Sequence, residues 1–322
     1  EPACGVRSTG TWKPLWWIVI GVPLAAFSIW AIADNPKQYV STLLNGVTLA
    51  ALYFLVASGF TLIFGLMRNV NLAHGSLYLF GAYMGWIVGD ATDNWFLAVA
   101  VGFASAAIVG LLLQVSIFRF MQGQELRQTL VTIGLSIVLA DLMLWWFGGE
   151  IYSFDPPRAI FKAMPMLVVQ KYPTYRLVVL GIAIAIGIIL WLFLNRTRVG
   201  MMIRAGVDDR GMLAASGVNV QRVFAITFAI GAGLAGFAGV IGGTALSISP
   251  GEDTRYLLAS LVVVIVGGMG SITGAALGAL LIGLAEQFGL AYAPTYGVVF
   301  TFLIMVLVLA FRPYGILGRR TA

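Results

Sequence analysis

The sequence predicts an all-α fold, a polytopic transmembrane helix bundle with about ten membrane crossings and with broken or half-helices among them. Composition is the first reason: 60% of the 322 residues are hydrophobic and 10% are charged, and the mean hydropathy is +0.95. A soluble domain needs about 25% charged residues to cover its surface, so the main solvent of this chain must be lipid. The second reason is that the apolar residues form runs long enough to cross a bilayer. The third is that the basic residues gather at the ends of these runs.

The first crossing is expected at 15–33, within an N-terminal segment that covers residues 1–39. Its end, Ala31-Ile32-Ala33, imitates a signal-peptidase site. Tryptophans stand at both ends of the run: Trp16, Trp17 and Trp30. Because interfacial tryptophans are typical of a membrane span, a retained helix is favoured over a cleaved signal.

The later crossings follow from apolar runs of about 20 residues. The candidates are 40–66, 72–89, 95–118, 129–147, 177–195, 223–245, 257–290 and 296–311. As one straight helix, 257–290 would be about 51 Å long, against a hydrocarbon core of about 30 Å. The glycine-rich stretch Gly267–Gly274 is a natural break, so two crossings or two half-helices fit this segment better than one.

The charges of the loops set the orientation. The connections near 119–128 and 195–222 and the tail after Arg312 are basic, whereas 34–39, 90–94 and 246–256 carry mainly acidic residues. The positive-inside rule then places both termini in the cytoplasm, which requires ten crossings with 257–290 divided in two. The long 148–176 connection is an exception because it is basic although it falls outside. Its prolines favour an ordered extracytoplasmic cap.

No reaction centre, cofactor site or metal site is expected. His74 is the only histidine and Cys4 the only cysteine, so neither a metal cluster nor a nucleophile pair is indicated. The phosphate-binding pattern GxxxxGK[ST] does not occur in the sequence. The net charge of +6 does not indicate a nucleic-acid partner, because the basic residues flank apolar spans.

Polar residues interrupt the apolar sequence between 64 and 86. They are Arg68, Asn69, Asn71 and His74, and glycines surround them at 65, 75, 81 and 85. Buried polar groups in a membrane bundle need partners and tend to lie on a pathway or a packing seam. The alternative is a cytoplasmic turn whose polar groups cap the next helix. The candidate translocation or gating residues are Asn71, His74, Gly75, Gly267, Gly268 and Gly270.

Two carboxylates stand within apolar runs, Asp141 and Glu286. Nearby tryptophans at 145 and 146, and Tyr292, place them towards the outer boundary, where paired structural carboxylates are favoured over proton relays. If they were relays, Asp141, Glu286 and His74 would serve an ion-coupled secondary transporter or channel. A purely structural scaffold is a third class. Small residues at 231–243 and 270–283 indicate tight helix packing, which is compatible with rocking motions.

Residues 195–222 form a basic island between two apolar runs, with arginines at 196, 198, 204, 210 and 222. Such a segment marks a cytoplasmic loop. Its centre predicts a short surface helix with Asp208 and Asp209 at the start and Gly217 just past the end. A membrane protein that presents such a helix to the cytoplasm is expected to dock a partner there.

Several linked motifs resemble the branched-chain amino acid permeases of bacterial ABC importers. They run in order from about Val40 to Gly318 and include polar connections as well as apolar spans. The motifs are FTLIFGLMRNVNLAHGSLYLFGAY, TLVTIGLSIVLADL, NRTRVGMMIRAGVDDRGMLAASGVNV, GAGLAGFAGV, SISPGEDTRYLLASLVVVIVGGMGSITGAALGALLIGLAEQ and FRPYGILG. The resemblance implies a permease domain at 40–318, preceded by the segment 1–39 and followed by a tail at 319–322.

The resemblance also implies function and partners. Such a subunit lies in the bacterial inner membrane and moves a branched-chain or related amphipathic amino acid inward, with a second permease subunit or a copy of itself. Two cytoplasmic ATPase subunits and a periplasmic solute-binding protein complete the importer. By analogy a coupling helix inserts into an ATPase groove; its residues would be Arg204, Ala205, Gly206, Asp208, Ala214, Ala215 and Gly217. Relatives serve urea, short amides or aromatic acids, and many have Glu where this chain has Ser76, so the solute itself stays open.

Overall fold

The computed structural model describes residues 26–67, 70–121, 123–157, 160, 163–164 and 171–318. Of the expected first crossing, 15–33, only the last part falls in these ranges; residues 26–34 are helical. The rest of that crossing, the polar pair Arg68 and Asn69, and the tail 319–322 lie outside the described residues.

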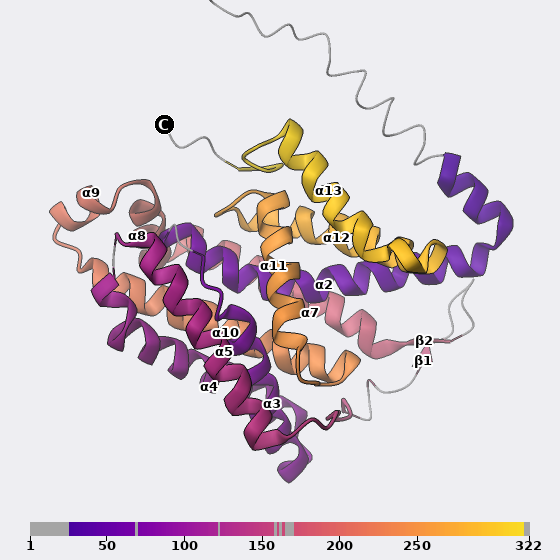
Figure 1. The fold of residues 1–322 in the computed structure, drawn as a ribbon, viewed down its shortest axis with the longest axis horizontal. Helices are drawn as coiled ribbons and strands as arrows, with labels where there is room; N and C mark the ends of the chain where they lie inside the picture. Colours follow the sequence, from indigo (N-terminus) through magenta and orange to yellow (C-terminus); the bar gives the residue numbers. More distant parts are fainter. Residues whose placement is uncertain are drawn as a thin grey trace, which may run out of the picture.

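The described helices follow the order that the sequence predicts (Figure 1). The long ones are α2 Pro36–Met67, α3 His74–Thr92, α4 Trp95–Ser116, α5 Glu125–Phe147, α7 Thr174–Arg196, α10 Val220–Leu246, α11 Glu252–Gly267, α12 Ile272–Tyr292 and α13 Gly297–Phe311. Short elements join them: η1 Phe118–Met121, β1 Ala163–Met164, β2 Tyr172–Pro173, α8 Arg198–Asp208, α9 Arg210–Ala215 and η2 Pro294–Tyr296. The two strands pair antiparallel.

The all-α polytopic architecture is confirmed. Within the described ranges, six helices are long and apolar enough to cross a membrane: α2, α4, α5, α7, α10 and α12. The predicted break in 257–290 is also confirmed, because α11 ends at Gly267 and α12 begins at Ile272. With 16 residues, α11 is about 24 Å long and thus shorter than the hydrocarbon core. The total of ten crossings stays a prediction.

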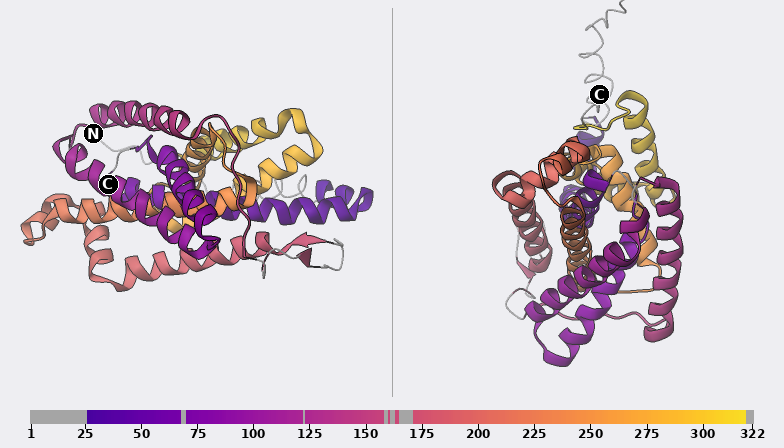
Figure 2. Two further views of the ribbon diagram at one scale, coloured as in Figure 1. Left: turned by 90° about the horizontal axis from the view of Figure 1, so that it is seen from below. Right: turned by 90° about the vertical axis from the view of Figure 1, so that its left-hand side faces the viewer.

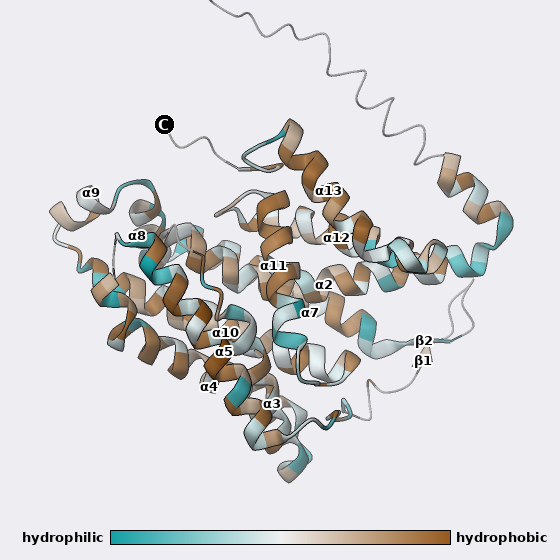
Figure 3. Cartoon of the chain, viewed as in Figure 1, coloured by the Kyte–Doolittle hydropathy of each residue, from teal (hydrophilic) through white to brown (hydrophobic). Residues whose placement is uncertain are grey.

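Helix α2 lies at the centre of the bundle and contacts α7, α10, α11 and α12. Most of its apolar stretch is buried, whereas most residues in the apolar stretches of α4, α5 and α7 are not buried. Figure 2 shows α5 and α7 on opposite sides of the molecule. In Figure 3 the outer helices are largely hydrophobic and hydrophilic residues gather at helix ends and connections. This pattern is expected where lipid surrounds the bundle.

Glycines allow three helices to meet at their backbones. A Cβ atom on Gly81 of α3 would overlap the backbone of Gly236 in α10, and a Cβ on Gly236 would overlap the carbonyl oxygen of Gly102 in α4. The small residues of 231–243 therefore serve packing, as the sequence predicts.

The described part of the 148–176 connection is ordered against the bundle. Tyr152 and Ile248 exchange two backbone hydrogen bonds, of 2.9 and 2.7 Å, and the Tyr152 ring lies 4.2 Å from that of Trp86, centroid to centroid. The Tyr172 hydroxyl lies 3.1 Å from Oγ1 of Thr48 in α2. Its extracytoplasmic position remains a prediction.

We predict that Gly81→Ala lowers the free energy of unfolding by about 1–3 kcal/mol, because the added methyl group overlaps the α10 backbone. Gly134→Ala in α5 is the matched control, since no atom of the described residues lies within 4 Å of its Cβ position and alanine is the better helix former. Thermal unfolding in detergent measures both variants. Equal midpoints for the two would show that the α3–α10 contact is not tight.

Candidate functional site

Two helices begin inside the bundle, beside the middle of α2. At the start of α3, Nε2 of His74 donates a hydrogen bond to the carbonyl oxygen of Val56, at 3.1 Å. In the first turns of α11, the Tyr256 ring meets the Tyr53 ring, with centroids 6.1 Å apart. The two helix starts also touch, because a Cβ atom on Gly75 would overlap the carbonyl oxygen of Asp253.

We name this region the α3–α11 junction; it comprises residues 71–78 and 252–256 together with Tyr53–Val56. Non-helical backbone at membrane depth occurs where it is buried in protein or lines a cavity, and discontinuous helices often mark transport sites. The junction therefore holds the strongest candidate pathway in the described chain.

The polar side chains at the start of α3 are buried. Asn71 is 4% exposed and His74 is 0% exposed. Oδ1 of Asn71 accepts a hydrogen bond from the backbone nitrogen of Ala73 at 3.1 Å, and Oγ1 of Thr132 in α5 accepts one from Leu72 N at 3.2 Å. Asn71 thus contacts the backbone just before α3, but it does not cap the helix, whose N-cap Ala73 has no side-chain capping bond.

Two polar atoms at this helix start have no protein partner among the described residues, Nδ2 of Asn71 and Nδ1 of His74. Buried polar atoms are normally paired with protein or water. Their position beside a helix start agrees with either a packing seam or a pathway. Both interpretations of Asn71, His74 and Gly75 stay open.

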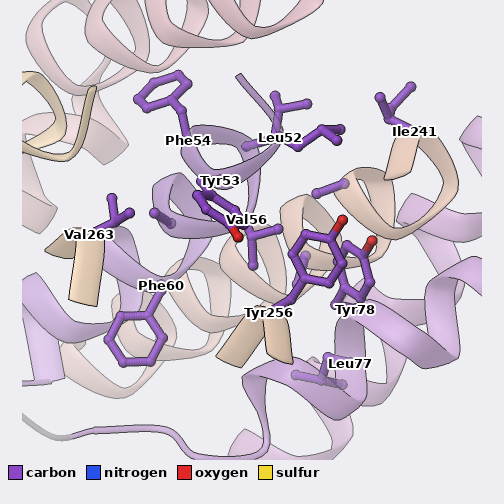
Figure 4. Packing of buried hydrophobic residues seen from close by; sticks show 14 of the residues in the cluster. Leu52, Tyr53, Phe54, Val56, Phe60, Leu77, Tyr78, Ile241, Tyr256 and Val263 are labelled. Atoms are coloured by element: carbon purple, nitrogen blue, oxygen red, sulfur yellow. The ribbon is translucent and has the colours of Figure 1, made fainter. Parts of the chain in front are cut away.

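A charged group lies next to the junction. Oη of Tyr53 donates a hydrogen bond to Oε2 of Glu286 in α12 at 2.7 Å. The guanidinium of Arg255 lies 3.5 Å from Glu252 and 3.9 Å from Glu286, measured N to O. We call Tyr53, Glu252, Arg255 and Glu286 the Arg255 cluster. Next to Tyr53, the rings of Tyr78 and Tyr256 stack with centroids 4.3 Å apart, as Figure 4 shows.

The cluster bears on two expectations. Glu286 has partners, as expected for a paired carboxylate. The three groups of the alternative ion relay are not brought together: no hydrogen bond or ion pair in the described part of the chain joins Asp141, Glu286 and His74, and Asp141 lies on the exposed side of α5. Sequence reasoning missed Arg255 and Tyr53. Arg255 offered a signal, since it is a cation one turn inside an apolar helix.

The break between α11 and α12 lies at the other end of α11. Gly268 and Gly270 have φ angles of +108° and +80°, which favour glycine. Oγ of Ser271 accepts a hydrogen bond from Gly274 N at 3.0 Å and caps α12. Gly267, at the end of α11, lies 11 residues beyond Tyr256, the last junction residue, or about 16 Å along the helix, so the six candidate path residues form two separate groups.

Residues 314–318, which we name the C-terminal strap, close this break. The backbone nitrogens of Ile316 and Leu317 donate to the carbonyl oxygens of Val266 and Gly267, at 2.9 and 3.0 Å. These carbonyls end α11 and have no partner within the helix. Gly315 packs against Gly268 with φ of +78°.

The residues of the expected coupling helix are divided between two helices. The predicted surface helix, with Asp208 and Asp209 at its start, corresponds to α9, whose N-cap is Asp209. Arg204, Ala205, Gly206 and Asp208 lie in α8, and Ala214 and Ala215 lie in α9. Asp209 separates the helices because its backbone is extended, at φ −150° and ψ 110°, and its carboxylate caps α9 by accepting from Met212 N at 3.0 Å. Gly217 follows α9 with φ of +83°, as predicted.

Helix α8 rests on the bundle and α9 stands outward. Ile203 of α8 packs with Val223 and Phe224 at the start of α10. On α9, Leu213 is 6% exposed but Met212 is 73% exposed. The neighbouring small residues are exposed as well: Gly211, Ala214, Ala215 and Gly217. This face combines a flexible apolar side chain with small neighbours, which suits contact with a partner protein.

Comparisons with known proteins give consistent results. A family described as the permease component of the branched-chain amino acid transport system matches residues 42–309. The chain is 35% identical to the high-affinity branched-chain amino acid transport system permease protein BraD of Pseudomonas aeruginosa, over 88% of this chain and 96% of the relative. It is 30% identical to LivH, the corresponding permease protein of Escherichia coli, over 89% and 98%. The ribose import permease RbsC of Escherichia coli is 26% identical over 77% of each chain. No solved structure matches.

We predict that Gly315→Ala lowers the thermal midpoint more than Gly217→Ala does. Both glycines have positive φ, so both alanines carry a backbone strain of about 1–2 kcal/mol. At position 315 the new Cβ would also lie 2.6 Å from the Gly268 backbone, whereas at position 217 it would have no neighbour within 4 Å in the described part of the chain. Thermal unfolding with limited proteolysis of the C-terminal strap measures the difference. Similar losses for the two variants would argue against a packed strap.

Proposed function

We propose that this chain, which belongs to the family of branched-chain amino acid transport system permease components, is the membrane-spanning subunit of an ATP-driven importer. It carries a branched-chain amino acid, or a related amphipathic amino acid, into the cell across the bacterial inner membrane. Support comes from relatives described as high-affinity branched-chain amino acid transport system permease proteins, which align over nearly their whole length. The buried start of α3 and the start of α11 that touches it supply a candidate pathway of the kind that transporters use.

The assembly follows from what the chain contains. The sequence has no GxxxxGK[ST] pattern, so two partner ATPase subunits hydrolyse the ATP. A second permease subunit, the same or related, forms the other half of the pathway, and a periplasmic binding protein delivers the solute. The described helices supply the lipid-facing surface.

The observation that carries the ATP-driven part is the exposed face of α9. In this proposal the coupling residues, Arg204, Ala205, Gly206, Asp208, Ala214, Ala215 and Gly217, transmit the movement of an ATPase. The Asp209 cap joins α9 to α8, and Ile203 of α8 packs on the start of α10. Farther along α10, Gly239 packs against the backbone of Tyr78, which belongs to the α3–α11 junction. A push on α9 thus reaches the candidate pathway through packed helices.

We predict that Met212→Asp lowers solute-stimulated ATP hydrolysis by the assembled complex at least about tenfold, because a charge would be buried in the ATPase contact without a partner. The matched control is Met164→Asp, at another exposed methionine (52% exposed) in β1, which should leave hydrolysis unchanged. Membrane insertion of both variants is checked by extraction. Normal coupling in Met212→Asp would refute the docking role of α9.

A second prediction concerns the side of the membrane. Cys4 is the only cysteine, so Cys4→Ser gives a cysteine-free background. In it, Met212→Cys should react with an impermeant thiol reagent only from the cytoplasmic side, and Met164→Cys only from the outside, because the basic 195–222 segment faces inward. Labelling of intact cells and inverted vesicles measures this. Reaction of Met212→Cys from the exterior would overturn the orientation and with it the ATPase contact.

A further inference from the structure

We infer that the Arg255 cluster binds the charged end of the transported amino acid, with Arg255 holding its carboxylate and Glu252 and Glu286 holding its ammonium group. This inference rests on the proposed function and adds a site to it. The site lies next to the α3–α11 junction, on the exposed side of α11, and its chemical class of ligand is a zwitterionic α-amino acid with an apolar side chain.

The charges of the cluster are not satisfied internally. Its three charged groups carry one positive and two negative formal charges. The N to O distances of 3.5 and 3.9 Å exceed the 2.7–2.9 Å or so of charge-assisted hydrogen bonds. Arg255 therefore keeps its N–H donors for another acceptor. The surplus carboxylate favours an additional cation.

The cluster is also reachable. The side chain of Arg255 is 48% exposed, and those of Glu252 and Glu286 are 23% and 14% exposed. Charges inside a membrane-spanning bundle are costly and usually serve a pathway. Tyr53 holds one oxygen of Glu286 through its 2.7 Å hydrogen bond, which fixes the carboxylate and leaves Oε1 facing Arg255.

The groups along α11 suit the three substituents on the α-carbon of the proposed ligand. Glu252, Arg255 and Leu258 follow one another at three-residue spacing, which places neighbouring members on one face of the helix. Leu258 is 48% exposed and offers apolar contact to the side chain of the ligand. A guanidinium binds a carboxylate in bidentate fashion, and a carboxylate binds an ammonium group. Carboxylate, cation and apolar surface thus stand side by side.

The site is connected to the moving parts of the proposed mechanism. Tyr256, directly after Arg255, stacks on Tyr78, and Tyr78 is packed against Gly239 of α10. A shift of α10 would therefore move Tyr78 and Tyr256, and with them the neighbouring Arg255. This arrangement allows binding of the solute and movement of the coupling helices to influence each other.

Equilibrium binding of tritiated leucine to the complete permease–ATPase complex in nanodiscs, without binding protein, tests the inference. We expect weak binding by the wild type and a loss of at least about tenfold in affinity in Arg255→Gln and in Glu286→Gln, because each removes a charge-assisted contact. Arg255→Lys should retain part of the affinity. The charge-matched controls Arg127→Gln and Asp141→Asn, at exposed positions of α5, should bind like the wild type.

Competition with ligands that lack one charge separates recognition from a structural role. Leucine methyl ester lacks the carboxylate and 4-methylpentanoate lacks the ammonium group, so both should compete poorly in the wild type. In Arg255→Gln the ester should compete as well as leucine, and in Glu286→Gln 4-methylpentanoate should do so. A merely structural cluster would lower stability without changing these preferences.

Uptake of leucine into proteoliposomes that contain the wild-type complex, ATP and binding protein is measured first. Absence of uptake would contradict the proposed function itself. If uptake occurs, three results would overturn the site while leaving the proposed function in place. The first is that leucine does not bind in nanodiscs, and the second is that Arg255→Gln, Glu286→Gln and the controls bind with equal affinity. The third is that the competition profiles do not change.

Discussion

The structure depends on one constraint: helix ends that lie among other helices must find hydrogen-bond partners in protein, because lipid supplies none. Three ends in this chain meet that demand with different residues. Asn71 and Thr132 serve the start of α3. Ser271 caps the start of α12. At the end of α11, backbone nitrogens of the C-terminal strap donate hydrogen bonds to the last carbonyl oxygens. Without such partners, α3 and α11 could not begin or end where they do, and the bundle would have no interior polar region.

Close backbone packing makes these interior ends possible. The contacts among Gly81, Gly102 and Gly236 bring α3, α4 and α10 together without intervening side chains. Tyr78 and Tyr256 then fill the space between α3 and α11 with stacked rings. Rigid contacts of this kind transmit displacement, since well-packed interiors have few voids to absorb it. The same packing therefore supports both the stability of the bundle and the proposed transmission of movement from α9 to the junction.

Much of this architecture could be predicted from the sequence. Apolar runs located the helices, and the glycine-rich break at Gly267–Gly274 located the end of α11. Asp209 and Gly217 marked the two ends of α9, whereas helix α8, which ends at Asp208, was not predicted. The neighbours of Glu286 could not be foreseen either. Tyr53, Arg255 and Glu286 are far apart in the chain, and only the packing of α2, α11 and α12 brings them together.

The bridge between Tyr152 and Ile248 connects the 148–157 segment to the residues just before α11. Ile248 lies four residues before Glu252, and two backbone hydrogen bonds fasten it to Tyr152. A displacement of that segment would therefore move the first turn of α11, because only three residues separate Ile248 from Glu252. In the proposed importer, a protein that docks on this segment and an ATPase that contacts α9 would therefore both act on the α3–α11 junction.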